Sequence, residues 1–148
     1  MRKVFGMAVV LAGLASASAL AGPPVAAESK QFYPEAMAAF QEALSAQGFY
    51  VTRIQHVDRG LERRGFETAA YKVVFIAHPD MPALALENPS FYATLPLTVL
   101  VEETPASTAM FYRGDYGAIA GYALTPKGAG AVLEWEYKIT EAIGKATE

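Results

Sequence analysis

The sequence of 148 residues contains no cysteine, two histidines and one tryptophan. The absence of cysteine excludes disulfides, thiolate zinc sites, iron–sulfur clusters and thiol catalysis. Charged residues are also scarce, at 18% of the chain, and 12 Lys and Arg stand against 15 Asp and Glu. Proteins whose main partner is nucleic acid usually carry a basic face, so this charge balance argues against such a partner.

Hydrophobic residues are plentiful: they make up 53% of the chain, which excludes intrinsic disorder, and the length suits one domain. Arg2 and Lys3 precede a run of apolar and small residues that ends in an Ala-x-Ala site at Ala21. This pattern is typical of a secretory signal peptide over residues 1–21, and cleavage as late as Ala27 is an alternative.

Glycine and serine residues interrupt this apolar run and make it marginal for spanning a membrane, so we expect no stable membrane insertion after cleavage. The lack of cysteine at the cleavage site also excludes a lipoprotein anchor. We therefore expect a periplasmic or secreted protein in which residues 22–30 form a linker and residues 31–148 form a single domain.

Periodicity and capping signals predict four helices, and runs of β-branched and aromatic residues predict four strands. The predicted helices are 34–47, 59–64, 81–87 and 126–145, and the predicted strands are 49–57, 71–78, 95–103 and 107–113. Short connections and a hairpin between the last two strands favour antiparallel pairing. We expect an α+β fold, a two-layer sandwich with helices packed on a mostly antiparallel four-stranded sheet.

Four short motifs are found in order: the segment 61–74 (LERRGFETAAYKVV), the X-Pro turns His78-Pro79 and Asn88-Pro89, and the segment 95–102 (LPLTVLVE). Together they resemble the domain-of-unknown-function family 302 over roughly residues 33–113. The resemblance implies a compact α/β sandwich, often a dimer, with no established activity.

Two departures from this family pattern matter. Many members carry cysteine where this chain has Ala77 and Leu97, so a thiol-based or metal-based role is not carried over. Members also tend to have a strand before the first helix, and the residues available here are Glu28 to Phe32, so we expect that edge strand to be short or missing.

The candidate chemistry is sparse. No H-x-H, H-E-x-x-H or G-x-S-x-G pattern is present, so no catalytic or metal-binding residue is predicted. His56 and His78 each end a strand, and antiparallel pairing would separate them. A hydrolase with His78 as its base lacks a nucleophile. These absences favour a non-enzymatic role, while the question of an enzyme stays open.

If the protein binds a small molecule, four residues are the candidate contacts. They are His78 at a strand end, and Met110, Tyr112 and Tyr116 in and after the last strand, beside a glycine-rich loop. The alternative is that the tyrosines pack this loop onto the sheet. No cofactor is identified by these residues, and haem is one option for a planar ligand.

The strand pattern carries the main functional prediction. Apolar residues occupy both faces of the predicted sheet, and we expect Val74, Ile76 and Leu100, with Met110, on the face away from the helices. An apolar patch is usually covered, here by the C-terminal helix, by a second copy or by a ligand. We expect a non-enzymatic homodimer that associates through this face, with a binder of a small hydrophobic or planar ligand as the alternative.

Overall fold

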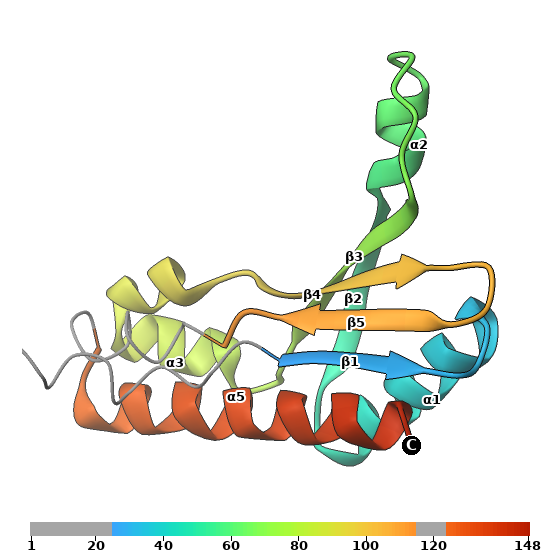
Figure 1. Cartoon of the computed structure of the whole chain (residues 1–148). Helices are drawn as coiled ribbons and strands as arrows, with labels where there is room; N and C mark the ends of the chain where they lie inside the picture. Colours follow the sequence, from blue (N-terminus) through green and yellow to red (C-terminus); the bar gives the residue numbers. More distant parts are fainter. Residues whose placement is uncertain (1–24, 115–123) are drawn as a thin grey trace, which may run out of the picture.

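A computed structural model of the chain describes residues 25–114 and 124–148, which form two layers (Figure 1). One layer is a sheet of five antiparallel strands in the order β1-β5-β4-β3-β2. The strands are β1 (Val25–Ser29), β2 (Tyr50–His56), β3 (Ala70–Ala77), β4 (Leu97–Glu103) and β5 (Thr108–Tyr112). The helices are α1 (Tyr33–Ala46), α2 (Val57–Glu62), α3 (Met81–Glu87) and α5 (Pro126–Ala146), and η1 (Pro89–Thr94) is a 3₁₀ turn. The predicted α+β class is confirmed.

Strand β1 lies within residues 22–30, which we expected to form a linker, and it is the short edge strand, formed by Val25–Ser29 instead of the residues from Glu28 to Phe32. All five residues of β1 pair with β5, from Val25 opposite Tyr112 to Ser29 opposite Thr108. The segment Val-Ala-Ala-Glu-Ser has little strand propensity of its own. This segment becomes a strand because it forms backbone hydrogen bonds with the free edge of β5. Such a long-range partner is not visible in the local sequence pattern.

Helix boundaries follow the signals in the sequence closely. Helix α3 has the predicted bounds, and α5 begins after Thr125, whose hydroxyl accepts a hydrogen bond from the backbone N–H of Gly128 at 3.3 Å. Helix α1 ends before Gly48, which has a φ of +87°. Within the described residues no helix is both long and apolar enough to cross a membrane.

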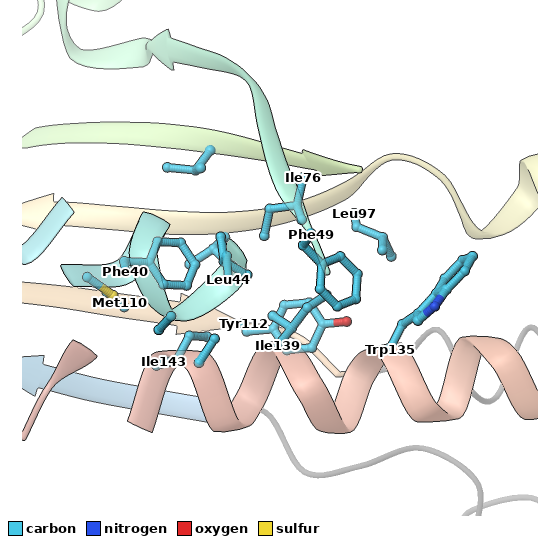
Figure 2. Packing of buried hydrophobic residues seen from close by; sticks show 14 of the residues in the cluster. Phe40, Leu44, Phe49, Ile76, Leu97, Met110, Tyr112, Trp135, Ile139 and Ile143 are labelled. Atoms are coloured by element: carbon cyan, nitrogen blue, oxygen red, sulfur yellow. The ribbon is translucent and has the colours of Figure 1, made fainter. Parts of the chain in front are cut away.

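Helices α1 and α5 lie against each other and cover one face of the sheet, as Figure 2 shows. Phe40 and Leu44 of α1 and Ile139 and Ile143 of α5 are fully buried there. From the sheet they meet a set of buried strand residues, which are Val74, Ile76, Leu97, Val99, Val101, Met110 and Tyr112. Each fully buried aliphatic side chain contributes about 1.5–3 kcal/mol.

This packing corrects the predicted orientation of β3 and the predicted position of Met110 in β5. Val74, Ile76 and Met110 are 0%, 4% and 0% exposed beneath the chain's own helices, so the prediction that they lie on the uncovered face is wrong. Leu100 does lie on the uncovered face, where it pairs with Val73.

Lys72 explains the error. It shares a face of β3 with Val74 and Ile76 and is itself 5% exposed, and a buried lysine is not expected from a sequence pattern. Its ammonium forms ion pairs with Glu103 and, at 3.9 Å, with Asp58, and it lies 4.2 Å from the ring centroid of Tyr33. These partners compensate the buried charge. The face of β3 that carries Lys72 can therefore point toward the helices.

Candidate functional site

Two surfaces of the described structure can recognise another molecule, and the first is the face of the sheet that the helices leave uncovered. A row of apolar side chains crosses four neighbouring strands there, because the register sets Ala26 opposite Phe111, Phe111 opposite Leu100, and Leu100 opposite Val73. Phe111 is 37% exposed, and Val73 and Leu100 are half-buried. A hollow of about 320 Å³ lies over this row, with Thr98 and Arg113 among its walls.

Opposite charges flank this apolar row. Glu102 lies opposite Tyr71, two residues before Val73, and Arg53 lies opposite Phe75, two residues after it. Val73 is therefore the midpoint between one acidic and one basic side chain. The Arg53 guanidinium lies 4.3 Å from the Phe75 ring centroid and donates a hydrogen bond to Gln55 at 3.0 Å. Within the described residues, neither Arg53 nor Glu102 has an ion-pair partner.

The second surface is a cleft of about 300 Å³ between α3 and α5. Its apolar walls are Ala83 and Leu84 of α3 and Ala131 and Trp135 of α5, and His78, just after β3, also lines it. Two contacts fix the spacing of the helices. The Asn88 side chain accepts a hydrogen bond from the Thr125 backbone N–H and donates one to the Leu84 carbonyl, and Lys127 forms an ion pair with Glu87 at 2.9 Å.

His78 is held between aromatic rings. Its imidazole lies 5.0 Å from the Trp135 ring at an interplanar angle of 31°, and 5.0 Å from the Phe49 ring nearly edge-on. Phe91 packs against Trp135 from another side at 5.7 Å. The side chain of His78 is 14% exposed. Gly48 makes this packing possible, since a Cβ there would lie 3.2 Å from Nε2 of His78.

The hydrogen bonding of His78 assigns its tautomer. Nδ1 accepts a hydrogen bond from the Asp80 backbone N–H at 3.2 Å, so the proton of the neutral ring is on Nε2. Burial is the main cause that lowers the pKa of His78 below its ordinary 6.5, with a smaller effect from Lys138, while Asp80 and Glu134 act in the opposite direction. His78 is therefore neutral at pH 7.

The charged rim of the cleft is nearly but not fully balanced. Lys127 pairs with Glu87, and Lys138 pairs with Glu134, one helical turn away, at 2.6 Å. The hydrogen bond from Lys138 is the main cause that lowers the pKa of Glu134. Asp80, 74% exposed, has neutral His78 as its neighbour, at 3.6 Å. The cleft therefore carries one negative charge without a cationic partner among the described residues.

The three predicted ligand contacts that the structure describes do not lie in one place. His78 lines the cleft, and Met110 is buried against the helices. Tyr112 is also buried there, but it lines the hollow over the uncovered face as well. Tyr116 lies outside the described residues. His56 and His78 lie at opposite ends of the β2–β3 pair, as antiparallel pairing requires. Among the described residues no group of three or more His, Cys, Asp or Glu is arranged to hold a metal.

Sequence reasoning missed the cleft because its walls come from segments far apart in the chain. Trp135 lies within the predicted helix 126–145, but the ring partners that place it beside His78 are long-range contacts. One signal is present in the sequence: Trp135 is the single tryptophan of the chain, and Glu134 and Lys138 beside it are spaced i,i+4.

The structure thus defines a class: small α+β domains with one helical layer, one uncovered sheet face and a cleft within the helical layer. Within this class the chain belongs to the family "Domain of unknown function DUF302", whose sequence profile matches residues 25–146. The crystal structure of an uncharacterized conserved DUF302 protein from Bacillus stearothermophilus shares the fold, with a TM-score of 0.71 and 16% sequence identity. That similarity covers 83% of this chain and 97% of the other. Comparison with the curated proteins finds no match.

Proposed function

We propose that this protein is exported and acts by association, as a homodimer that buries the uncovered face of its sheet. The observation that supports this most is the apolar row of Ala26, Phe111, Leu100 and Val73 across four strands, with no helix over it in the described structure. Contiguous apolar surface of this kind usually marks an interaction site.

The charges beside this row favour a second copy of the same chain as the partner. In a two-fold dimer the same patch serves both partners, so an acidic and a basic residue on opposite sides of the axis can each face the opposite charge of the other copy. An axis that lies in the plane of the face, passes Val73 and is perpendicular to the line from Glu102 to Arg53 brings Glu102 of each copy over Arg53 of the other. The same axis sets Leu100 over Phe75, and the strands of the two sheets then cross steeply, as in orthogonal sheet packing.

Charge reversal tests this arrangement. Glu102→Lys and Arg53→Glu should each make the protein monomeric at micromolar concentration, because each places like charges together twice in one dimer. Mixing the two variants should restore a 1:1 heterodimer, since both cross-axis pairs are then opposite in charge. Sedimentation velocity and native mass spectrometry measure the outcome.

The matched control is Glu42→Lys, which reverses an exposed acidic residue on α1. It should dimerise as the parent chain does. A parent chain that sediments as a monomer at all concentrations would overturn the homodimer, and a parent dimer that both single variants leave intact would overturn this arrangement.

The second candidate is a small hydrophobic or planar ligand, such as haem, on the same face. The hollow of about 320 Å³ over Val73, Leu100 and Phe111 favours it, because its walls are mainly apolar. Protein purified from its own host would then absorb in the visible range or carry extra mass in a native spectrum. A colourless preparation with the mass of the chain alone contradicts this candidate.

A further inference from the structure

We propose that the cleft between α3 and α5 is a separate binding site for a small molecule that combines a flat or apolar body with a cationic amine. This site is independent of the dimer, because its walls belong to the helical layer and to the turn after β3, whereas the uncovered face is on the other side of the sheet.

The charge of the cleft selects the amine. Each of its lysines already has a carboxylate, Lys127 with Glu87 and Lys138 with Glu134, and His78 is neutral at pH 7. The carboxylate of Asp80 is left to attract an incoming charge. An ammonium beside Asp80 completes the balance, whereas a carboxylate ligand would add to an excess of negative charge.

The walls select the body of the ligand. Ala83, Leu84, Ala131 and Trp135 present apolar surface, and a volume of about 300 Å³ is at the lower end of the range of small-molecule sites. The small side chains of the two alanines leave this space open. The Asn88–Thr125 hydrogen bond and the Lys127–Glu87 ion pair join the two helices at one end, so the cleft is formed before a ligand arrives.

The chain provides its own reporter, because its single tryptophan lies in the wall of the cleft. Titration with phenethylamine should change the emission of Trp135 and saturate. Phenylacetate and 2-phenylethanol, which have the same aromatic body and are anionic and neutral, should bind at least tenfold more weakly at low salt. Isothermal calorimetry on the full chain gives the same ranking without relying on fluorescence.

Three variants decide between charge recognition and simple apolar binding. Asp80→Asn should remove the preference for phenethylamine over 2-phenylethanol. Lys127→Met should increase this preference, because Glu87 then loses its partner while the Asn88–Thr125 hydrogen bond still joins the helices. Ala83→Leu, at an exposed position on α3, should weaken all three probes by filling the cleft. Glu35→Gln on α1 is the control and should change none of these affinities. Circular dichroism verifies that each variant is folded.

Three results would overturn the proposal. They are equal affinity for the amine and the acid, a preference that survives Asp80→Asn, and the absence of saturable binding of phenethylamine up to millimolar concentration. All three are independent of whether the parent chain forms dimers.

Discussion

His78 shows how one buried residue couples protonation to stability. Its Nδ1 accepts a hydrogen bond from Asp80, and burial against Trp135 and Phe49 lowers its pKa in the folded chain. In the unfolded chain the same histidine takes up a proton near its ordinary value of 6.5. Below that pH the unfolded state binds more protons than the folded state. The free energy of unfolding therefore decreases as the pH falls, until His78 is protonated in the folded chain as well.

We therefore predict that the free energy of unfolding decreases as the pH falls from 7 through 6.5, and that this decrease levels off below the folded-state pKa of His78. Urea unfolding at a series of pH values measures the slope. His78→Gln should lose this component, while His56→Gln, at the other end of the same strand pair, should keep it. An unchanged slope in His78→Gln would show that another group is responsible.

The burial of Lys72 could not be predicted from the sequence. The polar residues of β3 include Lys72, and a polar side chain is assigned to solvent unless its partners are known. Those partners, Asp58 and Glu103, come from α2 and from β4 and are brought together by the fold. The helix ends were predictable because capping by Thr125 and the stop at Gly48 depend on near neighbours alone.

At the scale of the element, β3 is a strand with apolar residues on both faces, and the structure assigns different roles to the two. Val74 is fully buried against the helices, whereas its neighbour Val73 is half-buried on the uncovered face. Hydrophobicity alone does not fix the orientation of such a strand. The fold class was predictable from the order of elements, and the inward face of β3 depended on one ion-pair network.

This assignment predicts different costs for one chemical change at adjacent positions. Val74→Ala removes buried methyl groups and leaves a cavity, so it should destabilise the domain by about 2–3 kcal/mol. Val73→Ala should cost less than about 1 kcal/mol, because its side chain keeps contact with solvent. Urea unfolding, at a protein concentration where the chain is monomeric, measures the stability of both variants. Equal costs would contradict the assignment of Val74 to the core and of Val73 to the uncovered face.

At the scale of the whole molecule, β1 links the fold to the proposed export. It pairs along its full length with β5 and completes the edge of the sheet, and Val25 and Ala27 pack against the core. Cleavage after Ala21 leaves β1 whole. Cleavage after Ala27 would remove Val25, Ala26 and Ala27, and with them three of the five paired positions.

We therefore predict that the exported protein begins at Gly22, as an intact-mass measurement of the chain from its own host would show. A mature chain that begins at Glu28 would contradict this argument, and a chain that retains residues 1–21 would contradict export with cleavage. The physical basis can be tested separately by comparing two chains that start at Gly22 and at Glu28. The shorter one loses an edge strand and part of the core's cover, so it should unfold at a lower urea concentration. Because Ala26 also belongs to the apolar row, the shorter chain should dimerise more weakly if the uncovered face is the interface.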